Sequence, residues 1–389
     1  MKKVFQVTCC LLVCGFLVPL QGVAEPLENR LKVASAEGGI HTEGDAGVKS
    51  LNDRIRRLEA QMKEKEEPRF GKWGEWVALS GLIEAEAGYE RLNFADPDAS
   101  NADASDLSLA TVELGIDAAI ARHVGGHILF LWEEDDTEPV DIDEGFIILD
   151  GADVVPLYLN AGKMYVPFGY FESHFISDPL TLELGETRES ALRVGFANDM
   201  VDLSVASFNG DVDEAGADDH VESFVGSARM TLPEGTVPGV GLVLGASYIS
   251  NMAESDGLEG EIPGEIADSV GGLGGFLSLS FIDRFFFEAE YVGALDEFQG
   301  GELSFDGGEA LKPAAWNFEF AVVPADDWEV AVKYEGGKDL GDFLPEEQYG
   351  GTVAYSLFEN TVLAMEYLHG EFENGDERDT VTAQLAITF

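Results

Sequence analysis

Residues 76–90 read WVALSGLIEAEAGYE, a stretch in which apolar and polar side chains alternate. One face is apolar or small and consists of Val77, Leu79, Gly81, Ile83, Ala85, Ala87 and Tyr89. The other face carries Ser80, Glu84 and Glu86. A period of two is the pattern of a β-strand between two environments. Because unpaired charges are costly to bury, carboxylates at this frequency indicate that one environment contains water.

The same alternation continues to the last residue. We predict strands near 76–90, 107–121, 124–134, 140–150, 155–165, 190–197, 199–208, 221–232, 239–250, 270–282, 284–295, 314–323, 327–335, 348–358, 360–371 and 379–389. All but 190–197 reach the roughly 9–11 residues that a tilted transmembrane strand needs. An even count of such strands is typical of a membrane barrel. The prediction is therefore an all-β fold, a transmembrane antiparallel β-barrel of about 16 strands within residues 70–389.

The connections between these segments alternate in length. After even strands they are tight turns, such as Arg122-His123, Asn198-Asp199, Asp283-Arg284, Pro324 to Asp326 and Glu359-Asn360. After most odd strands they are long, acidic and glycine-rich, as in 91–106, 209–220, 251–269, 296–313, 336–347 and 372–378. Short periplasmic turns and long extracellular loops are expected of an outer-membrane barrel. A soluble sandwich has no reason to alternate them so regularly.

The final segment supports closure of the barrel. Apolar residues stand at every second position up to the chain end, at Val381, Ala383, Leu385, Ile387 and Phe389. A free edge with a terminal phenylalanine would invite aggregation. Pairing of this strand with the first strand removes that edge.

The N-terminus has the three parts of a secretory signal peptide over residues 1–24. Lys2 and Lys3 precede an apolar run from Cys9 to Leu20, and a small-residue site ends at Ala24. The apolar run is shorter than the roughly 20 residues of a spanning helix, so cleavage near Ala24 is favoured over a membrane anchor. A lipoprotein site at Cys14 is a weaker alternative, because Val13 is bulky. Cell outer membrane is the expected location.

Residues 25–47 have no periodicity and are expected to form a flexible linker before a coiled-coil helix over 48–67. Apolar residues recur at spacings of three and four, at Val48, Leu51, Ile55, Leu58 and Met62. Because so short a helix is marginal alone, we expect it to self-associate, giving a homotrimer. The alternative is a lone amphipathic helix against the base of the barrel.

Composition excludes several classes of function. The chain has 74 acidic and 23 basic residues and a net charge of −51, which excludes nucleic acid as a partner. All three cysteines, Cys9, Cys10 and Cys14, lie in the signal segment, so the mature chain has no disulfide or thiolate metal site. No stretch after the signal reaches 18 apolar residues, as a helical span would. The acidity favours cations in any pore.

The connection after the fifth strand differs from the others, and we interpret residues 166–189 as a constriction loop. Residues 167–189 read PFGYFESHFISDPLTLELGETRE, and their apolar side chains would be costly in bulk water. The segment is therefore expected to fold into the lumen. The candidates for lining the narrowest point are Asp178, Glu183, Glu186, Arg188 and Glu189. A structural plug or brace with locally satisfied charges is an equally weighted alternative.

Two runs in this region resemble a known family. Residues 163–169, KMYVPFG, and residues 177–187, SDPLTLELGET, are similar to the LbtU-type siderophore porin family. The resemblance implies a signal peptide and short coiled coil before a sixteen-stranded barrel. It also implies passive, plug-free uptake of an iron-siderophore across the outer membrane. It implies no specific substrate-contacting residue.

The charge of the lumen leaves the solute open. Carboxylate-type ferric siderophores are usually anionic, and an acidic lumen repels anions over about 8–10 Å. Either Arg188, Arg193 and Arg229 provide a local path, or the solute is cationic or neutral. The rival functions are a general cation-preferring diffusion porin and a structural barrel that tethers the envelope. The expected partners are outer-membrane lipid, lipopolysaccharide and either a siderophore or a small cationic solute.

No catalytic or metal centre is expected, and no cofactor. His123 and His127 share a strand face without a third ligand nearby in sequence. Ser173 and His174 would point to opposite sides of an extended chain, which disfavours a hydrolase. Calcium binding by carboxylates such as Glu288 and Glu290 is less favoured than plain solvation. The sequence therefore predicts a transporter and not an enzyme.

Overall fold

A computed structural model describes residues 76–389 apart from 135–136, 138, 153, 217–219 and 234. The signal peptide, the linker and the coiled-coil helix predicted for residues 1–67 lie outside the described residues. Among the described residues, no helix is long and apolar enough to cross a membrane.

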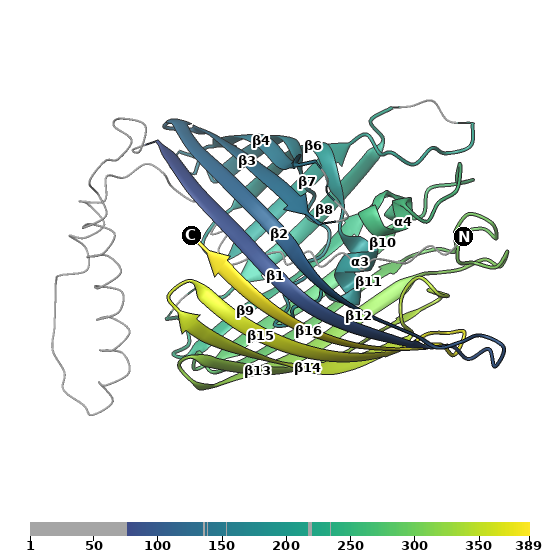
Figure 1. The fold of residues 1–389 in the computed structure, drawn as a ribbon. Coiled ribbons are helices and arrows are strands. Elements are labelled where there is room, and N and C mark those ends of the chain that lie inside the picture. The colour runs from purple at the N-terminus through teal and green to yellow at the C-terminus, as the bar shows by residue number, and fades with distance from the viewer. Residues whose placement is uncertain (1–75, 135–136, 138, 153, 217–219, 234) are drawn as a thin grey trace.

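The described chain forms one closed antiparallel barrel of sixteen strands (Figure 1). The strands are β1 Val77–Asn93, β2 Ala102–Ala121, β3 Val124–Glu133, β4 Asp141–Asp150, β5 Leu157–Tyr165, β6 Arg188–Ala197, β7 Val201–Phe208, β8 Ser223–Thr231, β9 Val240–Ile249, β10 Gly272–Phe281, β11 Phe285–Ala294, β12 Ala314–Ala325, β13 Trp328–Lys338, β14 Glu347–Phe358, β15 Thr361–Glu371 and β16 Glu377–Thr388. Each pairs with its neighbours in sequence, and β1 pairs with β16 from Leu82↔Thr388 to Asn93↔Glu377. The predicted all-β antiparallel barrel of about 16 strands and its closure by the last strand are confirmed.

Several predicted strand boundaries differ from the structure by a few residues, and two of these differences have a direct physical reason. Strand β12 continues through Pro324 to Ala325, where a turn was expected. Proline has no N–H for the ladder, and the register shifts between Val322 and Ala325, so a bulge accommodates it. Strand β2 begins at Ala102 and not near residue 107, because the polar residues at its start pair with the end of β1.

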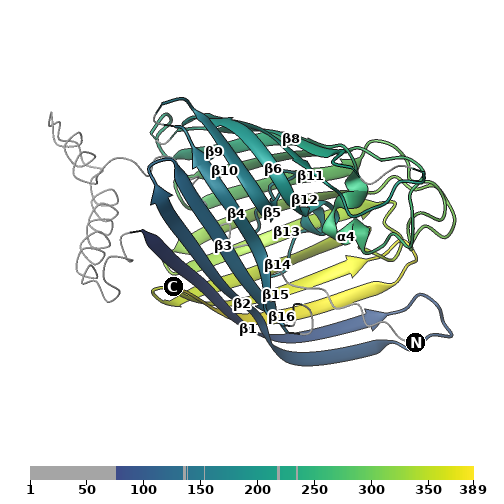
Figure 2. The same cartoon turned by 90° about the horizontal axis from the view of Figure 1, so that it is seen from above.

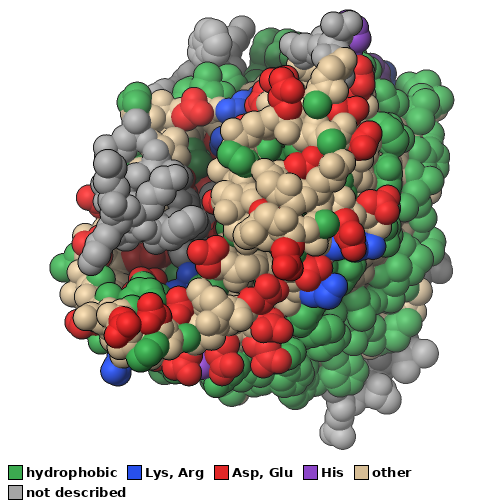
Figure 3. Space-filling view, turned by 90° about the vertical axis from the view of Figure 1, so that its right-hand side faces the viewer, with side chains coloured by type: hydrophobic (Ala, Val, Ile, Leu, Met, Phe, Trp, Pro, Cys, Tyr) green, Lys and Arg blue, Asp and Glu red, His purple; other side chains and the backbone are tan. Residues whose placement is uncertain are grey.

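The outer wall is apolar and carries aromatic side chains near both ends. Tyrosines face outward at the end with the long connections, at Tyr89, Tyr248, Tyr291, Tyr334, Tyr349 and Tyr367. At the other end Trp328 packs on Tyr355 with ring centroids 4.7 Å apart, and Phe389 is exposed. Hydrophobic side chains cover the flank of the barrel (Figure 3). Aromatic belts around an apolar band are the pattern of a barrel in a bilayer.

In the described parts of the long connections there are three short helices. They are α3 Leu180–Gly185 after β5, and η2 Met252–Glu254 and α4 Asp256–Glu259 after β9. Figures 1 and 2 show α4 beside the ends of the strands, and Figure 1 shows α3 within the barrel. Helix α3 contacts α4 and strands β11, β12 and β13. These contacts bring two loops together inside the same end of the barrel.

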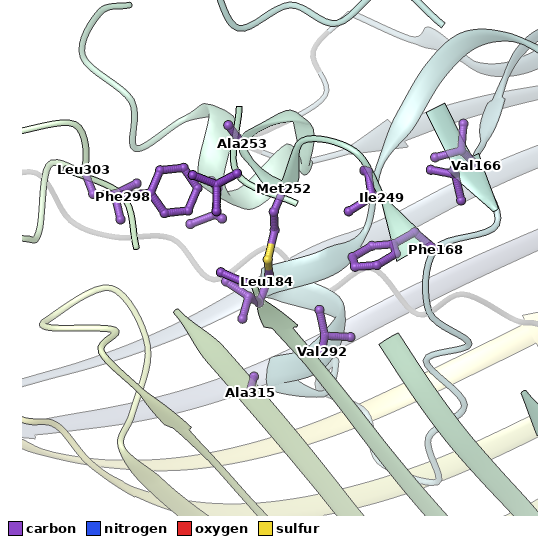
Figure 4. Packing of buried hydrophobic residues seen from close by; sticks show 14 of the residues in the cluster. Val166, Phe168, Leu184, Ile249, Met252, Ala253, Val292, Phe298, Leu303 and Ala315 are labelled. Atoms are coloured by element: carbon purple, nitrogen blue, oxygen red, sulfur yellow. The ribbon is translucent and has the colours of Figure 1, made fainter. Parts of the chain in front are cut away.

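The inward-folded loops share one apolar core. Leu184 of α3, Met252 of η2 and Phe298 of the loop after β11 are fully buried in the same cluster. Figure 4 shows the sulfur of Met252 directed at Leu184. Leu340 and Leu344 add the loop after β13. The sequence pattern pointed only to the loop after β5, but the loops after β9, β11 and β13 join it. Their signal was the apolar residues scattered among acidic ones, at Met252, Leu258, Ile262 and Ile266.

Candidate functional site

The connection between β5 and β6, residues 166–187, is called the inward loop. Its two ends meet where the Val166 N–H donates to the Thr187 carbonyl at 2.9 Å. The Gly169 N–H donates to the Ser247 hydroxyl of β9 at 3.0 Å. Gly169 has a φ of 86°, and a Cβ there would lie 2.1 Å from the Phe171 ring, so only glycine fits. From this point the chain runs along the lumen wall.

Glu290 of β11 holds the first part of the loop. Its carboxylate accepts the N–H groups of Tyr170 and Phe171 at 2.7 and 2.8 Å. The Thr181 hydroxyl donates to the same group at 3.3 Å, so one carboxylate joins two parts of the loop. Phe171 has a φ of 60°, a left-handed backbone that these contacts help to maintain.

Two further wall carboxylates hold the middle of the loop. Glu319 of β12 accepts the Ser173 hydroxyl and the His174 N–H at 2.8 and 2.7 Å. Glu366 of β15 accepts the Ile176 N–H at 2.6 Å. The same carboxylate accepts the N–H and the hydroxyl of Ser177 at 3.1 and 2.5 Å. Hydrogen bonds to an ionised acceptor are about twice as strong as neutral ones.

A buried lysine stands at the centre of these contacts. The Lys333 ammonium of β13 lies 3.4 Å from Glu335 and 3.8 Å from Glu319, and all three side chains are 0% exposed. It donates to the Ser177 carbonyl at 3.2 Å and lies 4.6 Å from the centre of the Phe175 ring. Glu335 in turn accepts the Leu180 N–H at 2.9 Å. Lys333 therefore neutralises part of the charge that fastens the loop.

The wall contacts correct one step of the sequence argument. Glu288, Glu290 and Glu319 are buried, although the alternation pattern was interpreted as carboxylates facing water. For Glu290 and Glu319, backbone N–H groups of the inward loop supply the donors that water was expected to supply. Lys333, Glu319, Glu335 and Glu366 were not predicted as site residues from the sequence; their signal was a charged residue at an inward position of β12, β13 and β15.

The predicted lining residues occupy several different places. Asp178 lies in the inward loop near Lys333, while Glu183 and Glu186 lie in and just after α3. Burial raises the pKa of Glu183 to about 7. Burial also raises the pKa of Glu186 well above its usual range, and the charges of Asp256 and Asp143 raise it further.

Arg188 and Glu189 belong to strand β6 and not to the loop. Arg188 forms an ion pair with the buried Asp143 of β4. Its N–H donates to Asp256 of α4 at 3.0 Å. Glu189 is buried beside the same end of the barrel. The structure thus gathers Glu186, Arg188 and Glu189 near one another and leaves Asp178 on the far part of the loop.

Arg193 forms a separate basic site with Arg229. Both guanidinium groups approach Asp202 of β7, at 3.8 Å from Arg193 and 3.2 Å from Arg229. The Tyr158 hydroxyl donates to Asp202 at 2.8 Å, and the Arg193 guanidinium lies 5.4 Å from the Tyr158 ring centre. Two cations share one carboxylate, so this part of the lumen carries a local positive charge.

The wall formed by β1, β2 and β3 is acidic. Its lumen-facing side carries Glu84, Glu86, Glu113 and Glu133, which we call the acidic strip. Glu84 experiences the negative charges of the other three. The hydrogen bonds of the inward loop run to β9, β11, β12, β13 and β15, on the other side of the barrel. The carboxylates of the acidic strip therefore lie on a different part of the wall from those that hold the inward loop.

His127 and His174 are each engaged with a carboxylate. His127 Nδ1 lies 2.8 Å from Asp117, and His174 Nδ1 lies 2.9 Å from Glu329. Ser173 donates to Glu319 and not to His174. Within the described ranges, no group of three or more His, Cys, Asp or Glu side chains is arranged to hold a metal ion.

The contact between His174 and Glu329 is expected to make the stability of the inward loop dependent on pH. Burial lowers its pKa, but the hydrogen bond and charge of Glu329, with the charges of Glu319 and Glu288, outweigh burial and raise the pKa above its usual value. With a raised pKa in the folded state, the contribution is complete below about pH 6.5 and is lost as pH rises through the folded pKa. We expect the melting temperature of the wild type to fall more steeply between pH 6 and 9 than that of His174→Gln. The protonated His174 contributes about 1.5 kcal/mol to the free energy of unfolding. A heat-modifiability gel series against pH measures the effect, and parallel curves for the wild type and His174→Gln would contradict the prediction.

Glu254 of η2 fastens the loop after β7 to the loop after β9. The buried carboxylate accepts the N–H groups of Asp211 and Val212 at 2.8 and 3.3 Å. We expect Glu254→Ala to accelerate hydrogen exchange in residues 209–216 about tenfold, since two amides lose a charged acceptor. Mass spectrometry of that peptide measures the effect. Glu259→Ala, at an exposed position of α4, is the matched control, and equal exchange in both variants refutes the assignment.

No family profile matches the chain. A UPF0422 protein of Legionella pneumophila strain Paris is 25% identical over 364 residues, which cover 80% of this chain and 66% of the relative. A UPF0422 protein of Coxiella burnetii is 25% identical over 309 residues, covering 75% of this chain and 64% of the relative. The chain thus spans less than two thirds of the Coxiella relative and 66% of the Legionella one.

Solved structures with the same architecture are outer-membrane proteins. The outer membrane channel DcaP of Acinetobacter baumannii aligns with a TM-score of 0.51 at 14% identity, covering 80% of this chain and 97% of DcaP. An anion-selective porin from Comamonas acidovorans aligns with a TM-score of 0.53 at 12% identity, covering 80% of this chain and 99% of that porin. At these identities the likeness concerns the fold. The described chain has the sixteen-stranded barrel fold of outer-membrane porins, and its sequence relatives are UPF0422 proteins.

Proposed function

We propose that the protein is a passive diffusion pore of the cell outer membrane and that the inward loop sets its narrowest passage. The observation that carries the proposal is the set of hydrogen bonds that N–H groups of the loop backbone donate to Glu290, Glu319 and Glu366. A loop that buried charges fix inside a closed barrel narrows the lumen permanently and needs no conformational change to do so. The apolar outer wall with aromatic belts suits insertion into a bilayer with outer-membrane lipid and lipopolysaccharide.

The charge distribution supports a preference for cations. The acidic strip lines one wall, and Asp and Glu side chains gather over the loops at the mouth (Figure 3). Lys333 pairs with Glu319, which holds the inward loop, and so does not offset the charge of the acidic strip. Negative side chains along a confined path raise the local concentration of cations. Among the predicted residues, Glu186 and Glu189 are the proposed acidic lining, with Arg188 held by Asp143.

Uptake of an iron-siderophore is the second candidate. The resemblance in residues 163–190 favours it, and so does the pair formed by Arg193 and Arg229. Guanidinium groups bind carboxylates through paired N–H donors, so this pair offers an anionic chelate a landing site in an otherwise acidic lumen. No chemical transformation is part of either candidate.

A planar bilayer experiment separates the two. The full-length mature protein is reconstituted, and conductance and reversal potential are recorded under a salt gradient with and without a ferric carboxylate siderophore. Cation-selective conductance without an effect of siderophore supports the general porin. Concentration-dependent block that is lost in Arg193→Gln/Arg229→Gln supports selective iron uptake. Absence of conductance refutes the pore and favours a structural barrel that tethers the envelope.

We further propose cleavage of the signal peptide near Ala24 and homotrimer assembly through residues 48–67. The apolar heptad spacing supports assembly, since short helices gain stability when joined to a larger oligomer. Cross-linking of the mature protein, compared with a chain lacking 48–67, tests this. Equal trimer yield from both contradicts a role for the helix.

A further inference from the structure

The barrel wall is low over five neighbouring strands, β4 to β8, which we call the low wall (Figure 1). The ladder has 6 residue pairs between β4 and β5 and 7 between β6 and β7, but 12 between β1 and β16. Strand β7 has 8 residues, whereas β2 has 20. At about 3.3 Å per residue and a tilt of roughly 40°, eight residues rise about 20 Å, which is less than the apolar band of about 25 Å in such barrels. A wall too short for the bilayer is accommodated by thinning of the bilayer, by anchoring side chains or by oligomerisation.

The aromatic belt is interrupted over the low wall. Outward tyrosines lie on β1, β9, β11, β13, β14 and β15. The described residues of β4 to β8 include no tryptophan, and their two tyrosines, Tyr158 and Tyr165, donate their hydroxyls to Asp202 and Asp143. Tyrosine and tryptophan at the membrane interfaces anchor a barrel wall in lipid. The low wall therefore has an apolar outer face without the anchors that contact with lipid normally uses.

The outer face of the low wall has protruding aliphatic side chains beside a hollow. Leu192 and Val194 of β6 and Leu203 and Val205 of β7 are 46–56% exposed. A hollow of about 610 Å³ lies where these strands meet β8 and β9, and Gly226 of β8 is among its lining residues. Well-packed protein interfaces fit protrusions of one partner into hollows of the other. The low wall offers both on one surface.

The size of the low wall suits contact with further copies of the chain. Five strands about 4.8 Å apart and roughly 25 Å long give about 600 Å² of flat wall, to which side-chain relief adds. A stable interface of standard size uses about 800 Å² of accessible surface per partner. Five of the sixteen strands take up roughly a third of the circumference. In a closed ring of three identical copies, each copy meets both neighbours within one such sector.

We infer that the outer wall of β4 to β8 is the surface through which copies of this chain pack against one another in the membrane. The tall walls with the aromatic belt then face the lipid. The contact lies on the barrel itself and is separate from the role proposed for residues 48–67. The inference goes beyond the proposed pore and does not depend on conduction, because the contact is on the outside of the wall.

Cysteine cross-linking in isolated outer membranes tests where the copies meet. The three native cysteines all precede residue 15, in the predicted signal peptide, so Val205→Cys and Val332→Cys each give the mature chain a single thiol. Both valines are 56% exposed, on β7 and β13, respectively, which makes them a matched pair. We expect a short bis-maleimide to join copies through position 205 about tenfold more than through position 332, since thiols held at a contact have a high effective concentration.

A bulky residue in the hollow tests the packing. A Cβ added at Gly226 would meet no atom within 4 Å, so Gly226→Trp fits the separate barrel but fills the hollow. The matched control is Gly351→Trp on the outer wall of β14, where an added Cβ would make one ordinary contact, at 3.5 Å. We expect Gly226→Trp to raise the dissociation constant of the detergent-extracted oligomer about tenfold or more and the control to assemble as wild type. Light scattering measures the mass of the full-length mature protein, and a heat-modifiability gel confirms that each variant forms a barrel.

The outcomes separate the low wall from other contacts. Preferential cross-linking at position 205 with weaker assembly of Gly226→Trp supports the inference. Equal yields at positions 205 and 332 would indicate random collisions and overturn it. A larger yield at position 332, assembly unaffected by Gly226→Trp, or a wild type that is monomeric in both assays also overturns it. A Gly226→Trp monomer that conducts leaves the pore intact, whereas an oligomer that forms through the low wall and does not conduct refutes the pore alone.

Discussion

Replacing Lys333 by methionine is expected to release the inward loop, to increase single-channel conductance severalfold and to lower the stability of the barrel. The ammonium is fully buried between Glu319 and Glu335 and donates to the loop carbonyl of Ser177. Methionine has a similar length but leaves two buried carboxylates without their cation. Breaking a buried ion pair by removing one partner costs roughly 3–5 kcal/mol. Repulsion among the carboxylates then drives water into the contact and the loop away from the wall.

Bilayer recording and thermal melting of the detergent-folded protein measure the two effects. Lys338→Met is the matched control, because Lys338 lies on the same strand with an exposed side chain that pairs with Asp339. We expect this control to behave as wild type. A second variant, Lys333→Met/Glu319→Gln, removes one of the stranded charges and is expected to recover part of the stability. Unchanged conductance in a Lys333→Met barrel that is less stable would show that the loop does not set the passage.

Substituting Glu366 by alanine is expected to free the tip of the loop alone. This carboxylate accepts the N–H groups of Ile176 and Ser177 and the Ser177 hydroxyl. Its loss leaves two backbone donors without an acceptor, at about 1–3 kcal/mol each. We expect conductance to become larger and noisier, with frequent transitions between levels as the tip leaves and rejoins the wall.

Glu366→Gln keeps one acceptor oxygen and should produce a smaller change than alanine. Glu377→Ala removes a carboxylate from an exposed position of the neighbouring strand β16 and is expected to leave conductance steady. Noise that is equal in Glu366→Ala and Glu377→Ala would mean that surface charge, and not release of the tip, is the cause. Hydrogen exchange of residues 170–180 provides an independent readout of loop release.

The two sets of carboxylates have opposite roles. On β11, β12, β13 and β15 they accept hydrogen bonds from N–H groups of the inward loop, and so they make the loop rigid. On β1, β2 and β3 they accept no printed hydrogen bond from the inward loop, and in the proposed pore they contribute negative charge to one wall. The proposed pore would gain from this division, because a rigid constriction and a charged opposite wall would act on the solute together.

Local alternation of side chains determined the architecture. The pattern in 76–90 and its repeats predicted all sixteen strands, because inward and outward positions differ at every second residue of a strand. The terminal Phe389 predicted closure, and its N–H and carbonyl bond with Gly81 of β1. The apolar content of 166–189 indicated a loop that avoids bulk water. None of these signals requires knowledge of distant contacts.

Only the tertiary structure decided which carboxylates bond to the inward loop and which do not. Tyr170 meets Glu290 across 120 positions of sequence, and Ile176 meets Glu366 across 190. Glu84 and Glu366 look alike on their strands, as inward acids in alternating segments. They differ because folding places loop N–H groups against one and not against the other. Sequence periodicity determines the face on which a side chain lies, whereas the partner it finds there depends on where the loops pack after the barrel has closed.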